Sequence, residues 1–329
     1  MKNPILFAFA VLGLAVGGTN GQAADESRPA ATVNGQAIPE VAVQRVLRRV
    51  PDDKRAEARK EIVDFLIDLV LLDQYVIQQG FNASDEEVQA RLKQFREEFT
   101  KSGTDYATVL KALMISEDEL QRQLAASIRW EKFLESKATD KQLSEFFVVR
   151  KDWFDGSQVR ARHILIAVTK DADPATRQAA QARITALKKQ IEERIAERTA
   201  KLNPRLDPLQ RAEARMEIAN EVFAEAARES DCPSKKNGGD LGLFPRRGAM
   251  VEPFAQAAFA LKPGEMAGPV ETEFGYHLIL CTGREPGSEV RFEDIKPFVR
   301  QAYSDWLRRD LLPHLRKSAR IEIAPPPSQ

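Results

Sequence analysis

Apolar residues recur at three- and four-residue steps in the first half of the chain. The clearest stripe lies between residues 53 and 79 and consists of Ile62, Phe65, Leu66, Leu69, Leu72 and Val76. Residues at this spacing share one face of an α-helix, so the stripe predicts a long helix, and Gly80 supplies its stop. We expect this face to pack into a core rather than to hold a cofactor.

The sequence from residue 31 to residue 155 predicts a small unit of several helices with one exception. Ala31–Gly35 is typical of a brief strand that ends in an Asn-Gly turn. Pro39 then suits the first turn of a helix that runs to Val50. Three further helix starts pair a hydroxyl cap with an acid or amide three residues later, namely Ser84 with Glu87, Ser116 with Glu119, and Thr139 with Gln142.

The pattern changes after residue 157, where short apolar and alternating segments predict strands. These segments are residues 159–166, 240–244, 268–271 and 276–282, with helices between them. Together with the helical first half, they predict an α+β fold.

A highly charged segment separates the first two of these strands. Ile184, Leu187, Ile191 and Ile195 keep one apolar stripe through it, and Pro204 then interrupts the pattern. Asp207 is placed to cap a new helix with Pro208 at its first position. We therefore predict a helical insertion at 188–217 formed by two antiparallel helices, and a disordered charged loop is the alternative.

The carboxyl-terminal region predicts one helix and one strand. The helix begins near Phe292 and runs through Trp306, and Arg320–Ile323 alternates as a short strand. An isolated short strand is not stable, so we expect it to pair with the strand at Thr32 and Val33. The helical domain would then be assembled from both termini.

Composition indicates a soluble protein with room for two domains, since the chain has 329 residues, 43% of them hydrophobic and 30% charged. The formal charge is zero, so no basic field exists to attract nucleic acid. Lys2, an uncharged apolar run from Ile5 to Val16 and the small residues that follow predict a cleaved signal peptide over 1–24 and an exported, periplasmic or extracellular location. An uncleaved membrane anchor stays open as the alternative.

Three segments separated in the sequence carry candidate chemistry. They are A-R-H-I-L around His163, S-D-C-P-S-K-K-N-G-G-D-L-G-L-F from Ser230 to Phe244, and F-G-Y-H-L-I-L around His277. Together they resemble the parvulin family of peptidyl-prolyl cis-trans isomerases. The preceding helical region makes the layout similar to that of exported chaperone-foldases of the SurA and PrsA type.

The resemblance implies a four-stranded antiparallel sheet with surrounding helices and a defined set of site residues. His163 and His277 would share a hydrogen bond at the sheet centre, and Cys232 would lie close to the amide as the third catalytic residue. Leu241, Met250 and Phe254 would line the pocket for the proline ring. By spacing alone, these three residues would be assigned to the core.

Rotation about an X-Pro amide has a barrier of about 18–20 kcal/mol because resonance is lost in the twisted form. An apolar slot beside a few polar groups favours that twisted form, so no cofactor and no metal is expected. The segment Gly238–Gly242 lacks the form of a phosphate-binding loop, so no nucleotide is expected either. Unfolded or partly folded exported polypeptides are the expected partners.

The predicted organisation has five parts. They are a signal peptide (1–24), an N-terminal helical chaperone domain (25–156), an isomerase domain (157–287) with the helical insertion, a helix and strand that complete the chaperone domain (288–323), and a disordered tail (324–329). A second hypothesis is a holdase whose isomerase domain only binds chains, and a third is a thiol or metal enzyme. A disulfide between Cys232 and Cys281, homodimerisation and weak association with a membrane stay open.

Overall fold

The computed structural model describes residues 28–169 and 171–326. The predicted signal peptide, residues 1–24, lies outside the described residues, and so do residues 327–329 of the predicted tail. In the part of the chain that is described, no helix combines the length and the apolar character needed to cross a membrane.

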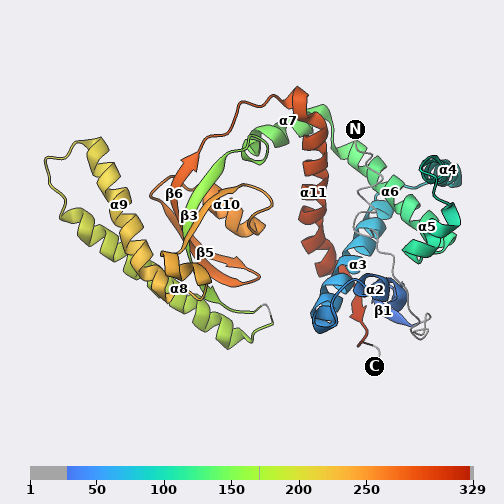
Figure 1. The fold of residues 1–329 in the computed structure, drawn as a ribbon, viewed down its shortest axis with the longest axis horizontal. Coiled ribbons are helices and arrows are strands. Elements are labelled where there is room, and N and C mark those ends of the chain that lie inside the picture. The colour runs from blue at the N-terminus through green and yellow to red at the C-terminus, as the bar shows by residue number, and fades with distance from the viewer. Residues whose placement is uncertain (1–27, 170, 327–329) are drawn as a thin grey trace. The chain divides into compact units, whose positions relative to one another are not determined.

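The chain divides into two compact units, and each is described by itself (Figure 1). Unit 1 contains Met1–Ser144 together with Pro297–Gln329, and unit 2 contains Glu145–Lys296. The boundaries between these units fall inside two helices, α7 (Asp140–Val149) and α11 (Phe292–Ser318), whereas the domain boundaries predicted from the sequence are at 156 and 287.

Unit 1 is built mainly from helices. They are α2 (Glu40–Leu47), α3 (Arg55–Gln78), α4 (Asp85–Lys101), α5 (Tyr106–Leu113) and α6 (Glu117–Lys137), with a 3-10 turn at Asp52–Lys54. Helices α4, α5 and α6 begin at polar caps. Ser84 forms the full reciprocal capping box with Glu87, and Ser116 Oγ accepts a hydrogen bond from the backbone N–H of Glu119.

The predicted long helix is confirmed as α3. The prediction that its apolar stripe packs into a core holds for Leu72 and Val76 but is wrong for Phe65 and Leu69, which are 45% and 38% exposed. The buried face of α3 is formed instead by Val63, Ile67 and Leu71 together with Leu72 and Val76.

A three-stranded antiparallel sheet joins the two ends of the described chain in the order β2-β1-β7. Its strands are β1 (Pro29–Val33), β2 (Gln36–Pro39) and β7 (Ile321–Ile323). Thr32 is opposite Glu322 and Val33 is opposite Ile321, so the predicted pairing of the terminal strands is confirmed. Residues of β1, α2 and α3 share one buried cluster, against which Leu315 of α11 packs.

Strand β2 was not predicted, and the helix that follows it is shorter than expected. Asn34 and Gly35 have φ angles of 51° and 86°, which suit a two-residue hairpin turn. The chain therefore returns alongside β1 instead of entering a helix. Pro39 ends this strand and stands before α2, which ends at Leu47 rather than at Val50. The Asn-Gly pair was a hairpin signal, but the four residues after it show no clear apolar pattern.

Unit 2 contains a four-stranded antiparallel sheet in the order β4-β3-β6-β5. The strands are β3 (Gln158–Ala167), β4 (Asp240–Pro245), β5 (Met266–Thr272) and β6 (Gly275–Glu285), and all four predicted strands are confirmed. Helices α8 (Pro174–Ala200), α9 (Pro208–Ala226) and α10 (Glu252–Ala260) surround the sheet. Short 3-10 helices lie at Lys151–Trp153, Ala227–Glu229 and Pro233–Asn237.

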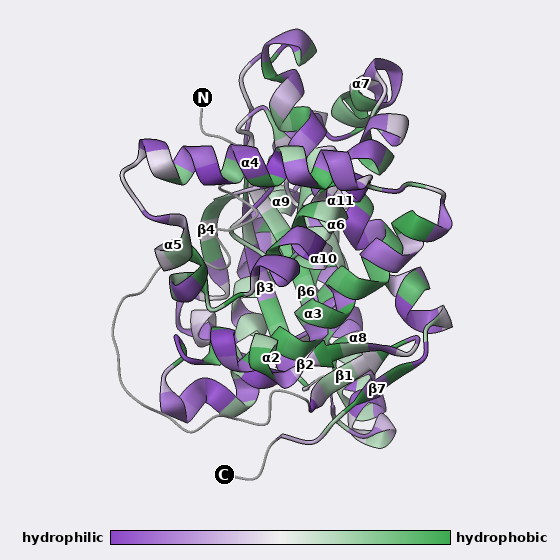
Figure 2. Ribbon diagram, turned by 90° about the vertical axis from the view of Figure 1, so that its right-hand side faces the viewer, coloured by the Kyte–Doolittle hydropathy of each residue, from purple (hydrophilic) through white to green (hydrophobic). Residues whose placement is uncertain are grey.

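The two faces of this sheet bury different clusters. Ile164 and Leu278 pack with α8 and α9 on one face, whereas Ala161 and Ile279 pack with α10 on the other. Burial on both faces explains why the central strands β3 and β6 are coloured mainly as hydrophobic residues (Figure 2). The α10 face is the one that carries the candidate site.

The charged segment between β3 and β4 is helical on both sides of a short connection. Asp207 caps α9 through a capping box with Gln210, and Pro208 is at the first helical position. Charged side chains link the two helices, as in the ion pair of Arg194 with Glu225. The apolar stripe of α8 enters the core, because Ile184 and Ile191 are 0% and 1% exposed. These helices are therefore anchored in unit 2 at their base.

Candidate active site

His163 and His277 lie on the same face of the two central strands. In the pairing of β3 with β6, His163 is opposite Ile279 and His277 is opposite Leu165. Because side chains on a strand alternate between faces, two such diagonal neighbours point to the same side. Their Nδ1 atoms are 3.4 Å apart. The rings are stacked at 19°, with centroids 5.6 Å apart.

Two hydroxyl groups extend the histidine pair into a chain of four side chains. His163 Nε2 lies 3.0 Å from Ser234 Oγ, and His277 Nε2 lies 2.8 Å from Thr272 Oγ1. A neutral imidazole has one N–H donor and one acceptor nitrogen. All four ring nitrogens therefore have a hydrogen-bond partner if both rings are neutral and if one of the two hydroxyl groups, of Ser234 or Thr272, donates while the other accepts.

Burial keeps both histidines neutral. It lowers the pKa of His163 from 6.5 to about 4. Burial also lowers the pKa of His277 to about 4, and the charge that His163 would carry adds to the effect. No opposing carboxylate is among the causes of either shift. The pair therefore acts at neutral pH as a fixed hydrogen-bonding element rather than as a source of charge.

We expect the unfolding free energy of unit 2 to fall as the pH is lowered from about 6.5 to about 4. The unfolded chain binds protons at its histidines near the upper value, whereas the folded pair resists them until the lower one. The histidine pair therefore contributes its full share of the unfolding free energy above the histidine pKa of the unfolded chain. This share is lost as the pH falls through the histidine pKa of the folded chain, and it is on the order of several kcal/mol in total. Urea unfolding at a series of pH values, with amide exchange of β3 and β6 as the readout, measures this loss of unfolding free energy.

Substitution of the buried histidines separates this effect from the titration of carboxylates. The His163→Gln, His277→Gln double variant should show a flatter pH profile than the wild type. His314 is exposed and is the third of the three histidines in the chain, so His314→Gln is the matched control and should leave the profile unchanged. Equal slopes for the wild type and the double variant would show that the pair is not held neutral.

Phe254 supplies an apolar wall beside the histidine rings. It is 3% exposed, and its ring stands edge-on to both histidines, with centroid distances of 5.7 Å to His163 and 5.4 Å to His277. Leu241 and Met250 are half-buried and pack against the cluster that contains Phe254. The structure thus brings the three predicted pocket residues to the histidine face of the sheet.

Cys232 lies in the segment that enters the site from α9. It is half-buried, and its backbone N–H donates to Ser230 Oγ at 3.1 Å. Ser230 Oγ also accepts from the N–H of Leu165 at 3.0 Å, which ties this segment to β3. Ser234, two residues after Cys232, reaches His163. These contacts tie the segment that carries Cys232 to β3 and to the ring of His163.

Gly239 allows this segment to approach β3 closely. Its φ angle is 78°, and its carbonyl accepts from the His163 N–H at 2.9 Å. A Cβ at this position would lie 2.4 Å from the His163 carbonyl oxygen, so a side chain cannot be accommodated there. The glycines of the N-G-G-D segment therefore shape the entry to β4.

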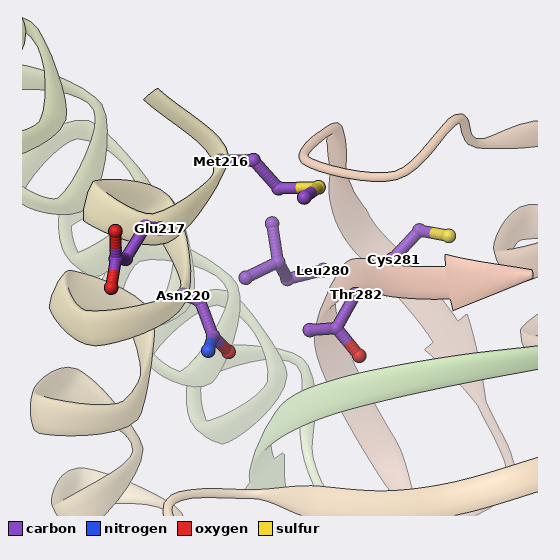
Figure 3. Close-up of a pocket in the computed structure, with 6 residues that line it drawn as sticks. All are labelled: Met216, Glu217, Asn220, Leu280, Cys281 and Thr282. Atoms are coloured by element: carbon purple, nitrogen blue, oxygen red, sulfur yellow. The ribbon is translucent and has the colours of Figure 1, made fainter. Parts of the chain in front are cut away.

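A hollow of about 200 Å³ lies on the opposite face of the sheet (Figure 3). Met216, Glu217 and Asn220 from α9 and Leu280 and Thr282 from β6 line it, and the Cys281 side chain points away from it. Because the histidines face α10, this hollow is not the candidate site.

The two cysteines and the possible metal ligands do not form a second centre in the structure. Cys232 and Cys281 are both free, and Cys281 is buried on the α10 face. Among residues 28–169 and 171–326, no group of three or more His, Cys, Asp and Glu side chains gathers around a common point.

Ser234 and Thr272 were not predicted as partners of the histidine pair. Ser234 was inside the segment singled out for Cys232, which it follows by two positions. Thr272 fell between the predicted strand at 268–271 and the segment around His277, which it precedes by five positions. Serine and threonine are common in turns, so neither position stood out. Only the pairing of β5 with β6 and the fold of the 3-10 helix at Pro233–Asn237 place their hydroxyls on the rings.

Two family models match the chain. A PPIC-type peptidyl-prolyl isomerase (rotamase) domain matches residues 198–283, and a SurA-like N-terminal domain matches residues 3–134. The isomerase match includes Cys232, Phe254 and His277 but begins after His163. His163 is supplied by β3, which the sheet places beside β6.

Curated relatives of this chain include proteins named as foldases. The chain is 29% identical over 230 residues to the foldase protein PrsA of Caldanaerobacter subterraneus, and the match covers 68% of this chain and 57% of the relative. It is 27% identical over 285 residues to the foldase protein PrsA of a Geobacillus species, covering 83% and 82% of the two chains. The chain thus spans little more than half the length of the first of these relatives.

Among solved structures, the peptidylprolyl isomerase PrsA from Bacillus anthracis matches with a TM-score of 0.40 and 21% identity, covering 77% of this chain and 96% of that one.

Proposed function

We propose that this chain, which carries a PPIC-type isomerase domain and a SurA-like N-terminal domain, is a peptidyl-prolyl cis-trans isomerase and chaperone that assists the folding of exported proteins. The observation that carries the proposal is the neutral, hydrogen-bonded pair of His163 and His277 with the ring of Phe254 set edge-on against both. This arrangement offers a water-poor apolar wall beside a fixed polar element. Those are the two features that amide rotation requires.

In this proposal the proline ring packs against Leu241, Met250 and Phe254. Removal of water from the amide favours the twisted form, because that form has less charge separation than the planar one. His163 and His277 set the shape and hydrogen bonding of the floor of the site. The thiol of Cys232 lies beside the amide and contributes a polar contact; rotation breaks no σ bond, so no covalent intermediate is needed.

The chaperone part of the proposal rests on unit 1 and on the relatives named foldases. Unfolded or partly folded exported polypeptides are the proposed partners. The predicted signal peptide over 1–24 supports a periplasmic or otherwise exported location, and the alternative is a membrane anchor formed by the same segment.

A refolding assay limited by proline isomerisation tests the enzyme activity. The uncatalysed step takes about 10–100 s at 25 °C, so catalysis by the purified mature protein should shorten the slow phase in proportion to its concentration. Suppression of client aggregation is measured in parallel. Binding of unfolded chains without any acceleration of the slow phase would replace the proposal with the holdase hypothesis.

A further inference from the structure

Arg246 is a buried cation at the end of β4, where the chain leaves the sheet toward α10. It is 6% exposed, and among the described residues of unit 2 no other lysine, arginine, aspartate or glutamate is buried. Removal of a guanidinium group from water is costly unless its N–H groups are paired in good geometry. The partners of Arg246 therefore indicate what this position holds together.

The guanidinium group closes the β4–α10 loop, residues 247–251. Its Nη2 donates to Glu252 Oε1 at 2.6 Å, and its Nη1 donates to Oε2 of the same carboxylate at 3.0 Å. Strand β4 ends at Pro245 and α10 begins at Glu252, so this ion pair joins the two ends of the loop. Two parallel N–H···O bonds fix the orientation of the partners as well as their distance.

A second set of contacts fixes Arg246 itself. Its guanidinium lies over the ring of Trp153, 5.4 Å from the ring centroid, and its Nε lies 3.4 Å from Asp152 Oδ2. Both partners belong to the 3-10 helix at Lys151–Trp153, which precedes β3. Arg246 is thus anchored to a segment outside the loop, and the loop is anchored to Arg246.

The β4–α10 loop carries Met250, one of the residues proposed to contact the proline ring. Residues 247–249 are exposed, so burial does little to hold this part of the loop. Met250 is half-buried and packs against the cluster that contains Phe254. Phe254 follows Glu252 by two positions on α10. The ion pair therefore sets the position of Met250 relative to the ring that faces the histidines.

We propose that Arg246 is a positioning residue of the isomerase, which keeps the β4–α10 loop in the shape that places Met250 on the wall of the proline pocket before a client binds. The inference rests on the proposed function. A wall that is in place beforehand spares the client the free energy of ordering the loop. Arg246 therefore acts on client binding through Met250 and not on the rotation of the amide itself.

Arg246→Gln tests this role, because glutamine lacks the charge and the planar fork of donors. With an Ala-Pro tetrapeptide, the variant should raise KM about tenfold, the value of one lost methionine contact, and change kcat less than about twofold. Loss of binding that is equal in the ground state and the transition state has this signature. A merely structural role would instead reduce the number of folded molecules, which lowers the apparent kcat and leaves KM unchanged.

A double-mutant cycle with Met250→Ala shows whether Arg246 acts through Met250. Met250→Ala alone should raise KM by a similar factor, and Arg246→Gln should add nothing to it, because both changes remove the same contact. Arg246→Lys keeps the charge without the fork and should give an intermediate KM. Glu252→Gln opens the ion pair from its other side, where the carboxylate side chain is 38% exposed, and supplies the same readout if Arg246→Gln fails to fold.

Arg160→Gln is the matched control. Arg160 also bonds one carboxylate twice, from Nη2 to Asp240 Oδ2 at 2.7 Å and from Nε to Oδ1 at 3.4 Å, and Asp240 is on β4. Its neighbours Val159 and Ala161 pack on the α10 face, so Arg160 points to the other face of the sheet. Both kcat and KM should stay at the wild-type values in this variant.

The outcomes separate this inference from the proposed function. An unchanged KM in both Arg246→Gln and Glu252→Gln, or a further rise of KM when Arg246→Gln is added to Met250→Ala, overturns the inference while the isomerase stands. Absence of turnover by the wild-type chain overturns the proposed function instead, and the Kd of the same peptide then replaces KM in the comparison.

Discussion

Removal of residues 297–329 is expected to unfold unit 1 while unit 2 stays folded. The deleted segment supplies β7, which pairs with β1, and Arg316, which bonds Asp64 and Asp68 on α3 at 3.1 and 2.6 Å. It also supplies Leu315, which packs on the core of β1, α2 and α3. The α3 segment should lose its amide-exchange protection, and β3 and β6 should keep theirs. Suppression of client aggregation should be lost, and isomerase activity should remain.

Loss of a single buried hydrogen bond tests the packing of α11 within unit 1 with a smaller change than the truncation. The indole N–H of Trp130 on α6 donates to Ser304 Oγ on α11 at 3.0 Å, and both residues are buried. Ser304→Ala leaves this donor without a partner, which costs about 1–3 kcal/mol. Ser318 on the same helix is exposed and bonds carbonyls of its own helix, so Ser318→Ala is the control.

For the truncation at residue 297, undiminished amide-exchange protection of α3 would exclude a domain built from both termini.

Phe254→Leu is expected to lower the isomerase activity about 10–100-fold, because it removes the ring that stands edge-on to both histidines. The wall of the proposed proline pocket would lose its flat surface, and water would gain access to the amide of a client bound there. The rate of the proline-limited refolding phase measures the loss of activity. A thermal melt measures the accompanying loss of stability, which is about 1–2 kcal/mol when one buried apolar side chain is replaced by another of different shape.

Phe259→Leu separates the pocket from the core. Phe259 is on the same helix, is 8% exposed and belongs to the same buried cluster, and its aromatic neighbour is Phe244 at a centroid distance of 6.3 Å. Its replacement should reduce stability to a similar degree and leave activity close to that of the wild type. Equal losses of activity in the two variants would mean that activity follows stability, and Phe254 would then be a core residue only.

Helices were predictable here because their signals are local. A helix needs apolar residues three and four positions apart and a cap within one turn, and both occur within short windows such as Ser84 with Glu87. The four strands of unit 2 were predictable for the same reason. Strand β2 was not, because Gln36–Pro39 is stabilised by pairing with β1 rather than by a pattern of its own.

Most residues of the candidate site could be predicted from three sequence segments, but their arrangement in space could not. His163 and His277 are 114 residues apart, and only the register of β3 against β6 makes them neighbours. Their hydroxyl partners, Ser234 and Thr272, gave no sequence signal because a hydroxyl becomes part of a network only when the fold aims it at a ring. The low pKa of each histidine likewise depends on burial, which no single residue encodes.

The sequence by itself therefore determined the helices, the strands of the larger sheet, the terminal strands and the residue types that resemble an isomerase site. The tertiary structure decided which of those residues meet, that the histidines are neutral, and that Ser234 and Thr272 complete their hydrogen-bonded network. The physical reason is the range of the forces involved. Periodicity and capping act within a few residues along the chain, whereas strand register, desolvation and side-chain networks arise only when distant segments pack together.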